Sequence, residues 1–253
     1  MYRAMLDRLI EIMRRLRDPA TGCEWDTVQT FTTIAPYTIE EAYEVADAIA
    51  RDDMDALADE LGDLQLQVIF HAQIAEDAGY FTLADVFTRI CDKMERRHPH
   101  IFGEAEHGGH HLWEKIKADE RAGNADRSAL AGVALALPAL ERAAKLQRRA
   151  ARVGFDWPDV SGPRAKIDEE LAELDAESRH PEMLEELGDL LFAVVNLARH
   201  LNIEPETALR EANRKFERRF REVETEPGFS ELSLDQKEEL WAAAKKAQAD
   251  SRA

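Results

Sequence analysis

Apolar residues recur along this chain at the spacing of a helix surface. Two stripes show the pattern most clearly: Leu6, Leu9, Met13 and Leu16, and then Leu57, Leu61, Leu64 and Val68. Steps of three and four residues place such side chains on one face of an α-helix, and the alternation typical of strands is absent from the pattern. The chain is therefore predicted to be all-α.

Helix starts are marked by capping residues. Thr38 with Glu41 and Ser233 with Gln236 have the three-residue spacing of a capping box. Each pair predicts that a helix begins just after its hydroxyl residue.

Prolines and short links complete the helical pattern. Pro181 and Pro205 stand where first-turn prolines belong. The segments 50–53 and 178–181 are short enough to favour antiparallel neighbours. We therefore expect helices packed as bundles.

The same landmarks occur twice in the same order. The matching segments are Leu6–Asp26 with Leu140–Asp159, Ile39–Val45 with Asp168–Leu174, Glu60–Leu64 with Glu186–Leu190, Asp92–His98 with Arg214–Phe220, and Leu112–Lys117 with Leu240–Lys245. The offset between copies drifts only from 122 to 134 residues. This self-similarity indicates a tandem duplication. Helical periodicity breaks near Gly123 and Ser128, which predicts two helical domains over residues 1–127 and 128–253.

Composition places the chain in a broad class. Its 253 residues hold one large or two ordinary domains. Cys23 and Cys91 form neither a disulfide framework nor a CxxC pair, which favours a reducing compartment. No apolar run reaches transmembrane length, and the first 18 residues lack the unbroken apolar core of a signal peptide. We expect a cytoplasmic protein without a membrane partner.

Net charge narrows the choice of ligand. The formal charge is −18, from 33 basic and 51 acidic residues. Such a field disfavours the phosphate backbone of nucleic acids and attracts divalent cations. We expect no nucleic-acid partner.

Pairs of acids three residues apart recur in both copies. The pairs are Glu41 with Glu44 and Glu60 with Asp63 in the first copy, and Glu170 with Glu173 and Glu186 with Asp189 in the second. Residues three apart share a helix face, so antiparallel neighbours bring four carboxylates together. Each close pair repels by roughly 4 kcal/mol at an effective dielectric of about 20. A bound divalent cation relieves this repulsion and leaves every oxygen charged.

The surroundings of Asp189 strengthen this hypothesis. Apolar residues fill most of this helix: Leu187, Leu190, Leu191, Phe192, Val194 and Val195. They predict burial, and an ionised carboxylate is costly there without a partner. An all-oxygen ligand set favours Mg²⁺, with Mn²⁺ as the alternative, over zinc or iron. The competing interpretation is a solvated acidic surface, in which Glu41 merely completes the cap of Thr38.

Basic residues stand near the acids. Lys215 and Arg219 are four residues apart and share a helix face, and Lys166 stands four residues before Glu170. Phosphoryl transfer needs such cations beside the metal. Pairing with surface glutamates is the simpler alternative for each of them alone.

These motifs together resemble a known family. EExxE followed by ELGD, with GCEWDTVQTFTTIAPYTIEEAYEV upstream in the first copy and ANRKFERRFREVE in the second, is similar to the two-domain form of the MazG nucleoside triphosphate pyrophosphohydrolases, of the all-α NTP pyrophosphatase superfamily. The resemblance implies Mg²⁺-dependent hydrolysis of a broad range of nucleoside triphosphates to monophosphate and diphosphate. It also implies a role in cleaning the nucleotide pool, and a homodimer.

The resemblance assigns roles to residues of this sequence. In the second copy it implies metal ligands at Glu170, Glu173, Glu186 and Asp189, catalytic cations at Lys215 and Arg219, and substrate contacts at Lys166, Glu169, Asn213, Lys215, Arg219 and Trp241. In the first copy it implies metal ligands at Glu41, Glu44, Glu60 and Asp63, with Lys93 and Arg97 in the basic positions.

The two copies differ at two of these positions. Tyr37 stands opposite Lys166, and Cys91 stands opposite Asn213. The first copy therefore lacks one cation and one amide that a nucleotide would contact. We predict that the second copy is the main catalytic centre.

Other functions stay open at this point. A relative restricted to dUTP, dCTP or phosphoribosyl-ATP would carry the same acids. A ferritin-like di-metal bundle would instead place a His three residues after a site Glu, and no site acid here has one. The third alternative is a non-enzymatic metal-binding or regulatory bundle.

Overall fold

The computed structural model describes residues 2–103, 116 and 126–250, and every regular element in these ranges is a helix. This confirms the all-α prediction. The chain divides into two compact units, Met1–Glu120 and Arg121–Ala253. The first repeat's segment 112–117, apart from residue 116, and part of the predicted domain link lie outside the described residues. No described helix is both long and apolar enough to cross a membrane.

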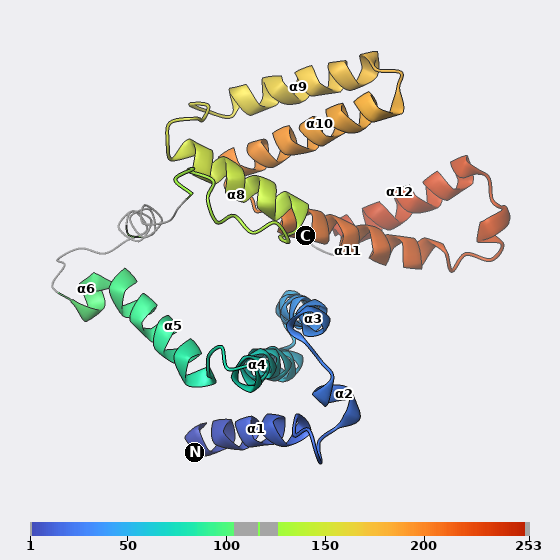
Figure 1. Cartoon of the computed structure of the whole chain (residues 1–253). Helices are drawn as coiled ribbons and strands as arrows, with labels where there is room; N and C mark the ends of the chain where they lie inside the picture. Colours follow the sequence, from blue (N-terminus) through green and yellow to red (C-terminus); the bar gives the residue numbers. More distant parts are fainter. Residues whose placement is uncertain (1, 104–115, 117–125, 251–253) are drawn as a thin grey trace. The chain divides into compact units, whose positions relative to one another are not determined.

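The N-terminal unit contains α1 (Tyr2–Leu16), α2 (Glu24–Thr27), α3 (Phe31–Ala50), α4 (Met54–Asp77), α5 (Leu83–Arg97) and α6 (Pro99–Phe102) (Figure 1). Its central feature is the α3–α4 hairpin. The Thr38 hydroxyl lies 3.0 Å from His71 Nε2, and Gln67 Nε2 donates to Glu41 Oε1 at 3.4 Å. Residue numbers therefore increase along α3 while they decrease along the facing part of α4. The two helices are antiparallel, as the short link between them predicted.

The core of this unit lies where α1 and α4 pack together with the start of α3. It is a cluster of buried side chains: Met13, Ile34, Ile69, Phe70, Ala72, Ile74 and Leu83. Met13 and Ile34 are each 1% exposed. The apolar stripe of the first helix is thereby explained by its packing on α4.

One predicted helix start is wrong. Helix α3 begins at Phe31, where Thr30 and Thr33 form the capping box. Thr38 lies inside the helix, and its hydroxyl donates to the Ile34 carbonyl. The other predicted box is confirmed, because the Ser233 amide donates to Gln236 Oε1 at 3.0 Å and the Gln236 amide donates to Ser233 Oγ at 3.3 Å.

The C-terminal unit repeats the central hairpin. It contains α8 (Ala139–Ala151), α9 (Ser161–Ala176), α10 (His180–His200), α11 (Pro205–Val223), the 3₁₀ turn η1 (Phe229–Glu231) and α12 (Leu234–Asp250). Pro181 and Pro205 lie in the first turns of α10 and α11, as predicted.

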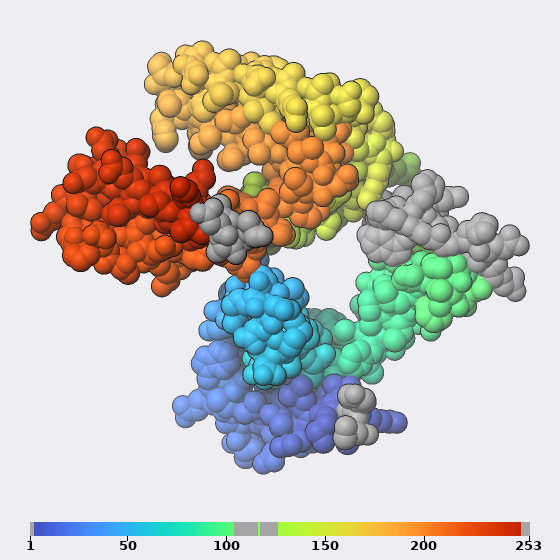
Figure 2. Space-filling model, turned by 180° about the vertical axis from the view of Figure 1, so that it is seen from behind, coloured from blue at the N-terminus to red at the C-terminus, as the bar shows by residue number. Residues whose placement is uncertain are grey.

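Two hairpins diverge within this unit. Helix α9 packs along α10, α12 packs along α11, and α8 contacts both α10 and α11 (Figure 1). Figure 2 shows a hollow between the red α11–α12 hairpin and the yellow-orange α9–α10 hairpin. Side chains on the two hairpins are therefore separated, except near α8.

The predicted burial of α10 is wrong for the single chain. Leu187, Leu191 and Val194 are 44%, 50% and 45% exposed, and Asp189 is exposed as well. Only Ala193, Val195 and Asn196 are buried on this helix. The apolar surface extends further around α10 than the faces that α8 and α9 cover.

Candidate active site

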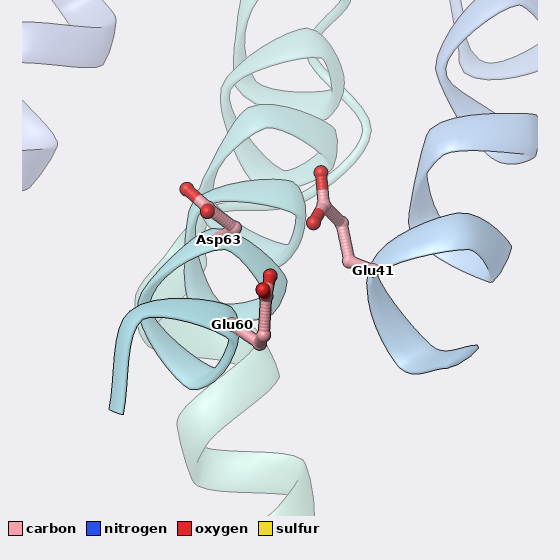
Figure 3. A group of neighbouring side chains, drawn as sticks. All are labelled: Glu41, Glu60 and Asp63. Carbon is pink, nitrogen blue, oxygen red and sulfur yellow. The ribbon is translucent and has the colours of Figure 1, made fainter. Parts of the chain in front are cut away.

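The α3–α4 hairpin brings three acids of the first copy together. Glu41 extends from α3 toward Glu60 and Asp63, which stand one turn apart on α4 (Figure 3). One carboxylate oxygen from each residue lies within 4.8 Å of the other two. The three-residue spacing puts Glu60 and Asp63 on one face, and the antiparallel pairing sets Glu41 opposite them.

The α9–α10 hairpin repeats this arrangement in the second copy. Oxygens of Glu170, Glu186 and Asp189 also lie within 4.8 Å of one another. Glu170 is 3% exposed, Glu186 is half-buried and Asp189 is exposed. The group therefore runs from the hairpin interior to its surface.

The fourth acid of each predicted set lies outside these groups but close to them. Burial raises the pKa of Glu41, and the charges of Asp63 and Glu44 raise it further. Burial likewise raises the pKa of Glu186, followed by the charges of Glu173 and Glu170. Three of the four predicted acids thus lie together in each copy, and Glu44 and Glu173 lie close enough to raise the pKa of one member of their group.

Lys166 borders the acids of the second copy. Its Nζ lies 2.6 Å from Glu170 Oε1 and donates to Glu169 Oε1 at 2.9 Å. These hydrogen bonds, with Glu170 first, raise the pKa of Lys166, so the ammonium stays charged. In the first copy the matching residue is Tyr37, whose ring meets Trp25 edge-on at 6.0 Å between centroids. At this position the second copy therefore has a positive charge beside its acids, and the first copy has an aromatic ring.

The remaining predicted substrate contacts lie on the α11–α12 hairpin. Arg219 Nε donates to Gln248 Oε1 at 3.0 Å, and its guanidinium lies 5.9 Å from the Trp241 ring centroid. Asn213 and Lys215 are exposed on α11. Within one chain, these residues are not brought to the acids of α9 and α10, because the two hairpins diverge (Figure 1). In the first copy, Lys93 and Arg97 lie on α5, which packs on α4.

Sequence reasoning missed a pocket that adjoins the acids of the second copy. Its volume is about 760 Å³. Its lining includes Gln147, Phe155, Trp157, Glu170, Asp189 and Asn196. Gln147 and Asn196 stand opposite Met13 and Phe70 in the repeat, so the exchange of apolar for polar residues was the available signal.

Comparison with known proteins matches both copies. The model of the MazG nucleotide pyrophosphohydrolase domain family matches residues 29–102 and 166–223. The nucleoside triphosphate pyrophosphohydrolase of Escherichia coli K12 is 51% identical over 97% of this chain and 98% of its own length. The nucleoside triphosphate pyrophosphohydrolase/pyrophosphatase MazG of Thermotoga maritima is 45% identical over 95% and 96%. Bacillus subtilis YabN, described as uncharacterized, is 46% identical over 92% of this chain and half of its own length.

Proposed function

This chain belongs to the MazG nucleotide pyrophosphohydrolase family, and on that premise we propose that it hydrolyses nucleoside triphosphates to the monophosphate and diphosphate. In this reaction water is added across the α–β phosphoanhydride linkage: a P–O bond of the bridge breaks, a new P–O bond forms to the water oxygen, and a proton is released to solvent. The products are the nucleoside monophosphate and diphosphate. The observation that carries the proposal is the group of three carboxylates on each central hairpin.

The acids fit a divalent metal such as Mg²⁺. All donors in each group are carboxylate oxygens, which are the ligands that Mg²⁺ prefers. Glu170 is buried, and burial, followed by the charges of Glu173 and Glu170, raises the pKa of Glu186, so a bound cation would relieve repulsion among these acids. Glu170, Glu186 and Asp189 would hold the metal in the second copy, with Glu173 beside them. The cofactor, when bound, polarises the phosphoryl group and acidifies the attacking water.

The chain's own residues supply binding and orientation. Lys166 places a fixed positive charge beside Glu170, where it can contact phosphate oxygens. The neighbouring Glu169 holds that ammonium in place. We propose that Asn213, Lys215, Arg219 and Trp241 add further substrate contacts. The C-terminal unit is then the main centre, since Tyr37 and Cys91 replace Lys166 and Asn213 in the first copy.

We propose that the active form is a homodimer. Large apolar side chains on two helices of the C-terminal unit are exposed in the single chain: Leu184, Leu187, Leu191 and Val194 on α10, and Leu209 and Phe216 on α11. Contiguous exposed apolar surface marks interaction sites. A partner subunit that covers α10 also provides a route for a second α11–α12 hairpin to reach the acids.

One assay tests the proposed reaction. Diphosphate release is measured for ATP, GTP, CTP, UTP and the deoxynucleotides, each with and without Mg²⁺. The proposal expects release from several substrates and loss of release when Mg²⁺ is removed. Release from a single nucleotide would instead identify a narrow-specificity relative. No release from any substrate would contradict the proposed function.

A further inference from the structure

Helix α9 carries Glu170, and its main packing partner among the described helices is α10. The short link 177–179 joins the two helices at one end of the hairpin (Figure 1). At the other end, where α9 begins and α10 ends, the loop 152–160 leads from α8 into α9. The position of α9 on α10 therefore depends on how this open end of the hairpin is fixed.

A pocket weakens the packing at the open end. It has a volume of about 760 Å³, and its lining includes Trp157 of the loop, Lys166 of α9 and Arg199 of α10. Atoms that face a cavity lack the contacts that a close-packed interior provides. The first turns of α9 are therefore held less firmly by packing, and a polar link at this end has more influence on their position.

Asp156 links the loop to the end of α10. Its two carboxylate oxygens accept from the Arg199 guanidinium, one from Nη1 at 2.9 Å and the other from Nη2. One of them also lies 3.1 Å from His200 Nε2. Arg199 is held on its own helix as well, because Nη2 and Nε donate to Asn196 Oδ1 at 2.7 and 3.1 Å. The Arg199 side chain is only 14% exposed, so water screens the ion pair weakly.

The same carboxylate fixes the connection from the loop to α9. Asp156 Oδ1 accepts from the backbone amide of Trp157 at 2.9 Å. The Trp157 indole packs on Gly162 in the first turn of α9, where an added Cβ would lie 2.3 Å from two indole carbons. Arg199 on α10 is thereby connected to α9 through two consecutive residues of the loop.

The acidic group lies between the two ends of the hairpin. Glu170 comes nine residues after the start of α9, and Asp189 comes eleven residues before the end of α10. Both are thus roughly 15 Å along the helix axes from the open end. Glu186 and Asp189 share α10, so one helix sets their spacing. The distance from Glu170 to both depends on how α9 lies on α10, and a link at the open end therefore affects the geometry of the acids.

The first unit joins the same two elements with an ion pair of reversed order. Arg17 lies in the segment between α1 and α2, and Asp77 is the last residue of α4. Arg17 Nε donates to Asp77 Oδ2 at 2.9 Å. Here the arginine belongs to the loop and the acid to the helix, whereas Asp156 belongs to the loop and Arg199 to the helix. Each unit thus fixes this junction with an ion pair of its own.

We infer that Asp156 and Arg199 are positioning residues for the acidic group of the second unit. Their ion pair fixes the open end of the hairpin. It thereby holds Glu170 at the distance from Glu186 and Asp189 that a shared cation requires. The inference rests on the proposed function, because it takes these acids to be metal ligands. Neither positioning residue contacts the metal in this role.

Mg²⁺ affinity tests this inference without relying on turnover. Calorimetric titration uses the full chain with Glu60→Gln in every sample, which removes one acid of the first unit so that the heat reports the second. Two variants break the ion pair with opposite changes in charge: Asp156→Asn removes a negative charge, and Arg199→Gln removes a positive one. Asp77→Asn is the matched control, since it breaks the corresponding pair of the other unit. Denaturant unfolding verifies that each variant is folded under the titration conditions.

We expect both variants to weaken Mg²⁺ binding about tenfold, at the lower end of the usual effect of losing a residue that orients metal ligands. Charge alone predicts opposite signs, because removal of the Arg199 charge would strengthen the binding of a cation. The double variant should lose no more affinity than either single variant, since the two residues act as one unit. Asp77→Asn should leave the affinity unchanged.

Three results would overturn the inference: unchanged Mg²⁺ affinity in Asp156→Asn, stronger binding in Arg199→Gln, or an equal loss in Asp77→Asn. If Arg199→Gln is unfolded, Arg199→Lys takes its place, because lysine keeps the charge and loses the second hydrogen bond to Asp156. A smaller loss of affinity is then expected, and no loss would count against the inference. Wild-type protein that binds no Mg²⁺ would instead contradict the proposed metal site itself, and with it this role of the ion pair.

Discussion

Among the cations predicted for the second copy, Lys166 lies beside the acids of its own chain. Its ammonium contacts the buried Glu170 at 2.6 Å, so it offsets part of the carboxylate repulsion, and under the proposed function it also contacts phosphate. Lys166→Gln should weaken the Mg²⁺ complex of α,β-methylene ATP about tenfold, since a hydrogen bond to a charged group is lost. Affinity for Mg²⁺ alone should be unchanged or higher, because a positive charge has been removed.

Calorimetry with Mg²⁺ and with the nucleotide analogue measures both effects of this change. Arg164→Gln, at an exposed position on the same helix, is the control for a lost surface charge. A parallel loss of Mg²⁺ affinity in Lys166→Gln would show that the lysine serves to position the acids and does not contact phosphate.

Glu186 and Glu60 occupy the same position in the two copies, which allows the copies to be ranked. Glu186→Gln keeps the side-chain shape and removes one charge from the acidic group of α9 and α10. We expect turnover to fall by about 100-fold or more, the usual effect of losing a group that stabilises transition-state charge. Glu60→Gln should change turnover less than about threefold if the second copy dominates. Steady-state diphosphate release measures both, and equal losses would refute the ranking.

Gln147 and Asn196 show why part of the site escaped sequence reasoning. Periodicity identifies buried positions by apolar residues, so two buried amides were not recognised as buried. Glu170, Glu186 and Asp189 were predictable because acids at helical spacing carry an electrostatic penalty that a bound cation relieves. The orientation of an amide depends on its neighbours, here Arg199 and the Phe192 carbonyl, and these contacts come from tertiary structure.

At the scale of elements, local sequence signals predicted that a segment is helical more reliably than they predicted the residue at which the helix begins. Thr30 with Thr33 and Thr38 with Glu41 both satisfy the spacing of a capping box. The structure selects the first pair, because Ile34 is 1% exposed and packs in the core only if the helix already includes it. Tertiary burial thus decides between two acceptable caps, even with Pro36 inside the resulting helix.

The loop between α8 and α9 is tied to the end of α10 through Asp156. Its carboxylate accepts from Arg199 Nη1 at 2.9 Å and lies 3.1 Å from His200 Nε2. The hydrogen bond from Arg199 is the largest of the effects that lower the pKa of Asp156. The folded protein therefore keeps this carboxylate ionised at pH values where the unfolded chain protonates it.

The free energy of unfolding should therefore decrease when the pH becomes low enough to protonate Asp156. The contribution of Asp156 is complete above the unfolded pKa of about 4 and disappears as pH falls through the lower folded pKa. Asp156→Asn should reduce the free energy of unfolding by about 2 kcal/mol at pH 7, and the difference from wild type should narrow below about pH 4. Denaturant unfolding at pH 7 and pH 3 measures this, with the exposed Asp175→Asn as control. A difference that does not change with pH would contradict the role of ionisation.

At the scale of the whole molecule, the duplication and the helical architecture followed from the sequence because both depend on repeated apolar spacing. The surface that the proposed homodimer would cover could not be predicted from the sequence. The pattern on α10 shows that Leu187 and Leu191 are apolar, but it does not say whether the same chain or another one covers them. In the single chain they are 44% and 50% exposed. We therefore attribute their apolar character to the interface of the proposed homodimer.

The proposed homodimer also affects which acids the cations of α11 can reach. Lys215 is exposed on a hairpin that diverges from the α9–α10 hairpin of its own chain (Figure 1). If it contacts phosphate, the acids it serves belong to the other subunit of the proposed homodimer. Two inactive variants would then complement each other, because each subunit supplies what the other lacks.

Glu186→Gln and Lys215→Ala should each lose most activity alone, and their mixed dimer should recover it. Contribution between subunits leaves one site of a mixed dimer intact and places both defects in the other, so the isolated mixed dimer should show about half of wild-type turnover. Contribution within a subunit leaves both sites damaged and restores none. Coexpression with two different tags isolates the mixed dimer, and sedimentation confirms its size. Absence of recovery in a confirmed mixed dimer would mean that α11 reaches the acids of its own chain by a change in hairpin angle.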